Sequence, residues 1–165
     1  MEILPETGTL HTVAQVAITL VGFTGIVIAY GERARENWTA EETLRLYTML
    51  YPTMTAFFCS FVPIVLIYFS VSIETTWRLS NAVLGLAHGI NLTVFLLEAK
   101  GKQITLGQKL NATFGISVVL AHFLACLAIV PWQQAIFIFG LLQQIFIGIH
   151  NFMLLFRPDT NERAK

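Results

Sequence analysis

Apolar and polar positions fall into long blocks along the chain. Asp, Glu, Lys and Arg are absent from four stretches, which cover residues 7–31, 46–73, 79–97 and 110–156. A membrane-spanning helix needs about 20 apolar residues, so each stretch is long enough for at least one span. The stretch 110–156 is too long for one span, because a single helix over it would measure about 70 Å against a hydrocarbon core of about 30 Å. We expect it to fold back at Pro131-Trp132-Gln133-Gln134, because proline starts or ends helices.

This pattern predicts an all-α fold, a polytopic membrane helix bundle with five transmembrane helices in a single domain over residues 1–165. The expected spans are 11–30, 48–72, 79–97, 112–130 and 134–156. The composition agrees, since 55% of the residues are hydrophobic and 12% are charged, whereas about 25% are charged in a soluble domain. It excludes a soluble enzyme and a disordered chain. A formal net charge of zero gives no electrostatic reason to expect a nucleic-acid partner.

The basic residues predict the orientation of the five spans. An odd number of spans places the two termini on opposite sides, and one side then receives Arg78 as its only basic residue. The other side receives Arg33, Arg35, Arg45, Lys100, Lys102, Lys109, Arg157, Arg163 and Lys165. Lys and Arg accumulate on the cytoplasmic side of membranes, so we expect the N-terminus outside and the C-terminus in the cytoplasm. Tyr68, Trp77 and Trp132 are expected at the outer membrane–water interface.

The second span is expected to belong to a longer helix. Thr39 and Glu42 have the spacing of a capping box, in which each side chain bonds a backbone amide at the helix start. This spacing predicts a helix from about residue 40 to 72, bent at Pro52 and Pro63.

Small residues recur at helical spacings of three and four in several spans. In lipid, helices associate where small residues let their backbones approach closely, so these stripes predict helix–helix contacts within one chain or between copies. The stripes comprise Gly22, Gly25 and Ala29, with Ala14 and Ala17; Asn81, Gly85 and Gly89; Ala121 and Ala125; and Gly140, Gln144 and Gly148. We expect contacts between copies among them, and hence a homo-oligomer.

Polar but uncharged side chains remain inside the spans, and no Asp or Glu lies deep in any of them. The absence of intramembrane carboxylates disfavours a proton pump or an ion-coupled carrier. His88 and His122 are expected near the bilayer centre on two different helices, which is the arrangement needed for axial ligation of haem iron. Haem b held by His88 and His122, in an electron-transfer protein, is therefore one alternative function. The simpler interpretation is that the polar residues hydrogen-bond across helices, each bond contributing about 0.6–2 kcal/mol.

A second alternative is a channel or pore surrounded by several copies. Pores need polar lining groups or hydrophobic gates, and the chain offers a polar intramembrane cluster for this role. Its members are Asn91, Gln143, Gln144, His150 and Asn151. No metal site and no catalytic residue are expected.

The order of motifs resembles a widespread group of small bacterial inner-membrane proteins. The resemblance lies in VAITLVGFTGIVIAYGERARENWTAEETLRL (16–46), WRLSNAVLGLAHG (77–89) and IGIHNFMLLFRPD (147–159). It implies a multi-pass protein of the bacterial cytoplasmic (inner) membrane and supplies no catalytic residue. A weaker likeness, carried by Trp38, Glu41, Glu42 and Arg45, is to the small membrane subunit of tripartite periplasmic transporters, which usually has four spans. We expect a non-enzymatic structural, effector or accessory subunit that contacts the lipid bilayer, associates with itself or joins a larger membrane complex.

Overall fold

The computed structural model of the chain describes residues 4–30 and 39–155. These residues form five α-helices and, within these two ranges, no strand. The helices are α1 (Thr7–Tyr30), α2 (Ala40–Tyr68), α3 (Ile73–Glu98), α4 (Leu106–Cys126) and α5 (Gln133–Leu155). Each is long and apolar enough to cross a membrane. The prediction of an all-α protein with five membrane-spanning helices is therefore confirmed.

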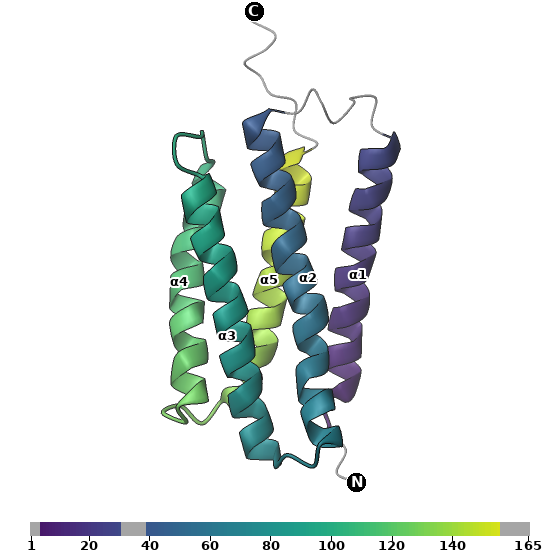
Figure 1. The fold of residues 1–165 in the computed structure, drawn as a ribbon, viewed down its shortest axis with the longest axis vertical. Coiled ribbons are helices and arrows are strands. Elements are labelled where there is room, and N and C mark those ends of the chain that lie inside the picture. Colours follow the sequence, from purple (N-terminus) through teal and green to yellow (C-terminus); the bar gives the residue numbers. More distant parts are fainter. Residues whose placement is uncertain (1–3, 31–38, 156–165) are drawn as a thin grey trace, which may run out of the picture.

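The helices run up and down along the long axis of the molecule (Figure 1). The most extensive packing is between α2 and α5, and α5 also contacts α1, α3 and α4. Helix α1 lies at one side of the bundle against α2 and α5, and α4 lies at the opposite side against α3 and α5. The apolar core lies where α1, α2, α3 and α5 meet, and a second part of the interior lies where α3, α4 and α5 face one another.

Hydroxyl side chains set where three of the helices begin. The capping box predicted at α2 is present, since the Glu42 amide donates to Thr39 Oγ1 over 3.1 Å and the Thr39 amide donates to a Glu42 carboxylate oxygen over 2.8 Å. Ser72 caps α3, and Thr105 forms a second capping box at α4. These two helices begin ahead of the expected spans, at Ile73 and Leu106 rather than at 79 and 112, because the capping residues and not the edges of the charge-free stretches fix the first turn. Helix α1 likewise begins at Thr7 and not at residue 11.

Two helices end earlier than the apolar pattern predicts. Helix α2 ends at Tyr68 and not at 72, and α4 ends at Cys126 and not at 130. Both ends have the hydrogen bonds of a Schellman motif: the Val71 amide donates to the Leu66 carbonyl over 3.1 Å, and the Ile129 amide donates to the Leu124 carbonyl over 3.0 Å. The turn residues are not glycines, since Ser70 has φ 59° and Ala128 has φ 57°. Helix α5 differs little from the expected 134–156, and residue 156 lies outside the described residues.

Two arginines donate hydrogen bonds to carbonyls at the C-terminal ends of neighbouring helices. Arg78 Nε on α3 donates to the Cys126 carbonyl at the end of α4 over 3.0 Å, and Arg45 Nη1 on α2 donates to the Leu154 carbonyl at the end of α5 over 3.3 Å. A cation is favourable at the C-terminal end of a helix, where carbonyls lack helical partners. Each arginine therefore stabilises the end of a neighbouring helix.

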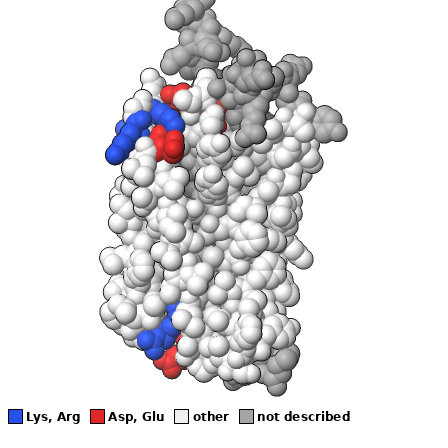
Figure 2. All heavy atoms as spheres, viewed as in Figure 1, with Lys and Arg blue, Asp and Glu red and all other residues white. Residues whose placement is uncertain are grey.

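Charged side chains on the visible face gather at the two ends of the molecule, and a band without charge separates them (Figure 2). Large apolar side chains are exposed within this band, for example Phe58, Leu86, Leu120 and Phe146. A soluble monomer rarely exposes so large a continuous apolar surface. The exposed apolar residues are therefore the lipid-contacting surface of a multi-pass membrane protein.

Some glycines of the small-residue stripes lie in tight contacts between helices, and others lie on the surface of the bundle. A Cβ added at Gly148 would collide with Thr53 Oγ1 on α2, and one added at Gly85 would lie 2.8 Å from His122 Cβ on α4. Glycine is needed at these two positions because the helices pack closely there. Gly22 and Gly25, in contrast, are exposed on α1, and a Cβ at either one would meet nothing within 4 Å.

Candidate functional site

Amide and imidazole side chains from three of the spans lie inside the bundle, whereas His11 and Gln15 on α1 are exposed. The buried members are Asn81, His88, Gln108, His122, Gln143, Gln144 and Asn151, all less than 9% exposed. They come from α3, α4 and α5, whose facing sides form the interior. The remaining two members of the predicted polar intramembrane cluster, Asn91 and His150, are half-buried. The described interior thus offers amide and imidazole groups, and its chemistry is hydrogen bonding.

At one end of the interior, Asn81 connects three helices. Its Nδ2 donates to the Trp77 carbonyl over 2.8 Å and to the Gln133 carbonyl at the start of α5 over 2.9 Å. Its Oδ1 lies 2.8 Å from His122 Nδ1 on α4. Because Oδ1 can only accept, this contact requires the hydrogen of His122 to be on Nδ1. Asn81 therefore fixes both the orientation and the tautomer of His122.

Glycines allow the His122 ring to fit between the helices. Gly85 on α3 lies against its Cβ, and a Cβ at Gly140 on α5 would collide with its Nε2 and Cε1. The His122 and His88 rings are neighbours, with centroids 6.4 Å apart and planes at 68°. The structure therefore brings together the two histidines proposed as haem ligands.

A porphyrin does not fit between these rings. His122 Nε2, the nitrogen left to bind iron once Nδ1 carries the hydrogen, faces Gly140. Gly115 lies beside His88 Nε2, where an added Cβ would be 3.3 Å from that nitrogen. With α3, α4 and α5 in such close contact, the residues present do not accommodate a haem group.

At the other end of the interior, Gln108 connects α4 to α5. Its Oε1 accepts from the Thr105 amide over 2.9 Å, which completes the capping box of α4. Its Nε2 donates to Asn151 Oδ1 over 3.0 Å, and Asn151 Nδ2 donates to the Ile147 carbonyl over 2.9 Å. One side chain therefore both caps a helix and bonds a neighbouring helix. Sequence reasoning missed Gln108, although Thr105-x-x-Gln108 has the spacing of a capping box.

Asn91 and His150 occupy the margins of this interior. Asn91 Nδ2 on α3 donates to Thr55 Oγ1 on α2 over 2.8 Å. The His150 ring lies near the Phe146 ring, with centroids 6.5 Å apart, and a Cβ at Gly107 on α4 would be 2.7 Å from it. Both residues therefore contribute to helix packing.

Between the two bonded ends lie polar groups without partners. Both amide atoms of Gln143, both amide atoms of Gln144 and His88 Nδ1 are buried and form no hydrogen bond with the described residues. A buried polar group without a partner destabilises a protein by about 1–3 kcal/mol. Native interiors keep few such groups, and each calls for an explanation such as an enclosed water or a ligand.

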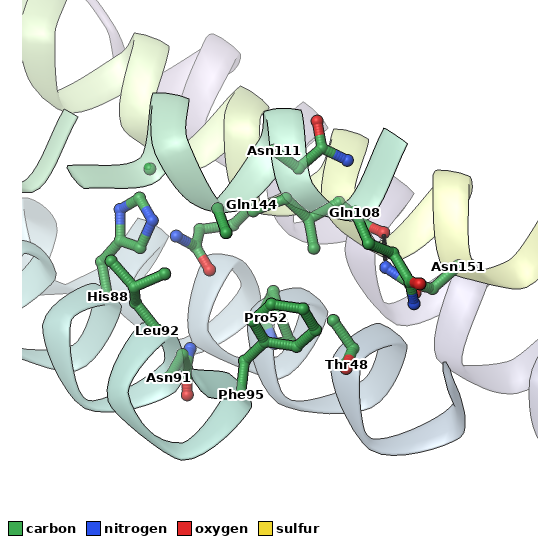
Figure 3. A pocket seen from close by; sticks show the side chains of 13 residues that line it. Thr48, Pro52, His88, Asn91, Leu92, Phe95, Gln108, Asn111, Gln144 and Asn151 are labelled. Atoms are coloured by element: carbon green, nitrogen blue, oxygen red, sulfur yellow. Dashed lines mark hydrogen bonds between the residues drawn. The ribbon is translucent and has the colours of Figure 1, made fainter. Parts of the chain in front are cut away.

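A partly enclosed cavity of about 40 Å³ adjoins two of these residues, His88 and Gln144. It lies between α2, α3, α4 and α5 and extends from His88 toward Gln108 and Asn151 (Figure 3). A cavity must offer about 10–15 Å³ by this measure to hold one water molecule. The cavity therefore has room for about two or three waters, or for one small solute.

The positions of Gln143, Gln144 and Asn151 bear on the predicted pore. Their exposed fractions are 6%, 0% and 1%, and they face the interior of a single chain. Residues that line a pore between copies would be on the outer surface of each copy. In this arrangement Gln144 and Asn151 instead line the cavity inside one bundle, and Gln143 is buried in the same bundle.

Comparisons of the chain with protein-family models, with curated proteins and with solved structures found no match. Among the described residues, no three His, Cys, Asp or Glu side chains are grouped so that they could hold a metal ion. The fold and the site define an integral membrane protein with five spans, whose described part encloses an apolar core and a set of buried, uncharged polar side chains.

Proposed function

We propose that the protein is a non-enzymatic structural or accessory subunit of the bacterial inner membrane that associates with further copies of itself through α1. The inner-membrane location follows from the resemblance to small bacterial inner-membrane proteins carried by residues 16–46, 77–89 and 147–159. The same proposal places the N-terminus outside and the C-terminus in the cytoplasm, because Lys and Arg favour the cytoplasmic side.

The observation that carries self-association is the contrast between the glycines of α1 and those of the other spans. Gly85, Gly140 and Gly148 are buried in contacts within the chain, but Gly22 and Gly25 face open space on the exposed side of α1. The opposite side of α1 packs into the bundle through residues such as Ala17 and Thr24. Exposed glycines with this spacing allow close approach of a second helix in lipid. A second copy of α1 is the partner with matching small residues.

Substitution of Gly22 by Leu tests this proposal. The added side chain has room within the monomer, so we expect the fold to remain intact, while the dissociation constant of the oligomer rises about tenfold or more, equivalent to about 1.4 kcal/mol. Sedimentation equilibrium of the purified protein in mild detergent measures the change.

Ser117→Leu is the matched control, because Ser117 is a small exposed residue on α4, across the bundle from α1. The control should leave the oligomer unchanged. A wild-type protein that sediments as a monomer, or equal effects of the two substitutions, would contradict association through α1.

The proposal includes membership of a larger membrane complex, in which the same exposed surface of α1 contacts the other subunits. The pore alternative lacks a comparable observation, because the polar residues it needs face the interior of each chain. The haem alternative lacks space for the porphyrin beside His122.

A further inference from the structure

The cavity inside the bundle lies at a place where hydrogen-bonding groups are left over. Gln144 is 0% exposed, and neither its Oε1 nor its Nε2 has a partner among the described residues. Its amide points toward His88, whose Nδ1 is also unpartnered (Figure 3). Both residues line the cavity. A buried amide that is fixed in position and left unpaired is half of a two-point hydrogen-bonding site.

A backbone carbonyl of a residue that lines the cavity also lacks its usual hydrogen-bond donor. Pro52 has no amide hydrogen, so the carbonyl of Thr48, four residues earlier, loses its usual helical hydrogen bond. Thr48 and Pro52 both line the cavity. A residue that lines the cavity therefore carries a backbone acceptor without its helical partner.

The charge of the cavity wall restricts what can bind. None of the described residues that line it is Asp, Glu, Lys or Arg. An ion transferred from water into a site without an opposite charge loses its hydration without compensation. The site therefore favours an uncharged molecule.

We propose that this cavity binds a small uncharged molecule that carries an adjacent donor and acceptor, such as a primary amide. The Gln144 amide donates through Nε2 and accepts through Oε1, so a second amide group pairs with it in two parallel hydrogen bonds. The volume of about 40 Å³ restricts the guest to a few non-hydrogen atoms. Formamide and acetamide are the smallest representatives of this class.

Gln108 and Asn151 also line the cavity. These two side chains lie together at the end of the cavity remote from His88 (Figure 3). They are already paired with each other and with the backbone. Their hydrogen-bonding groups are therefore in use, whereas those of Gln144 and His88 Nδ1 are left for the guest.

Saturation-transfer NMR on the full-length protein in lipid nanodiscs tests the proposal, with acetamide as the probe and acetate as its charged counterpart. We expect saturation transfer to acetamide at least fivefold stronger than to acetate. Gln144→Leu should abolish the acetamide signal. Gln143→Leu is the matched control, because Gln143 is a buried and unpartnered amide on the same helix that does not line the cavity, and it should retain the signal.

A second variant keeps the test decisive if Gln144→Leu does not fold. Ala112→Leu fills the cavity from α4 without removing a polar group, and it should also abolish the acetamide signal. Equal signals for acetamide and acetate, an unchanged signal in folded Gln144→Leu or Ala112→Leu, or transfer to water alone would overturn the proposal.

Discussion

At the scale of single residues, the interior depends on how glycines and histidines fit together. Gly85 and Gly140 lie against His122, and Gly115 lies beside His88. The His122 ring is not free to move aside, because its Nδ1 is bonded to Asn81. A side chain added at one of these glycines therefore meets a neighbour held in place by another helix.

Gly140→Ala measures how tightly this packing is constrained. The new methyl group would collide with the His122 ring, so we expect a loss of unfolding free energy of about 1–3 kcal/mol, typical of overpacking. Unfolding by sodium dodecyl sulfate from mixed micelles, followed by Trp fluorescence, gives the value. Gly89→Ala on α3 is the control, since its methyl group would lie 3.9 Å from Val119 Cγ1, an ordinary contact distance, and alanine favours helix. Similar losses in both variants would show that the contact with His122 does not matter.

Trp77 shows what could not be predicted for a single residue. Its position in the sequence predicted an interfacial tryptophan, as at Trp132, which is 69% exposed. Trp77 is instead 2% exposed and packs against Phe137 on α5, with ring centroids 5.7 Å apart. The sequence indicates how far along a helix a residue lies. The direction in which it points depends on partners that are distant in the chain.

At the scale of helices, the ends are defined by local hydrogen bonds that the apolar pattern does not contain. The capping box at Thr39 was predictable because its two residues have a fixed spacing. The ends of α2 and α4 were not predictable, because Ser70 and Ala128 adopt a left-handed conformation that usually requires glycine. Apolar residues continue past both ends, so hydropathy alone extends these helices too far.

Ala128→Gly tests the turn that ends α4. A left-handed conformation costs a residue with a Cβ about 1–2 kcal/mol, while glycine adds about 0.4–1 kcal/mol of entropy to the unfolded chain. We expect the substitution to raise the unfolding free energy by up to about 1 kcal/mol, measured by the same detergent titration. Ala121→Gly, inside α4, should instead lower it by about 1 kcal/mol. Destabilisation by both substitutions would contradict the role of the left-handed turn.

At the scale of the whole molecule, the number and type of the helices could be predicted from the sequence. Which helices pack against one another could not. The same small-residue pattern occurs in α1 and α3, yet Gly85 is buried against α4 whereas Gly22 faces outward. Of the amide and imidazole groups of the interior, Gln108 was not found from the sequence and Asn81 was found only as a member of a small-residue stripe. The cavity beside Gln144 was not found, because it results from the packing of four helices.

Reporter fusions test the orientation of the bundle. Among the described basic residues, Arg45, Lys100, Lys102 and Lys109 lie at one end of the bundle and Arg78 at the other. We expect alkaline phosphatase to be active when fused ahead of Met1, and green fluorescent protein to fluoresce when fused after Lys165, because the basic end remains in the cytoplasm. Each reporter exchanged to the other terminus is the control and should be inactive. Activity of one reporter at both termini would contradict an odd number of spans.

The two roles of Gln108 couple the interior of the bundle to its surface. The amide that bonds Asn151 also completes the cap of α4, so a molecule that displaces Gln108 on its way inward also releases the first turn of that helix. Displacement of Gln108 from Asn151 and loosening of the segment around Thr105 are then one event. Faster amide hydrogen exchange at this first turn of α4 would therefore report that Gln108 has been displaced from Asn151.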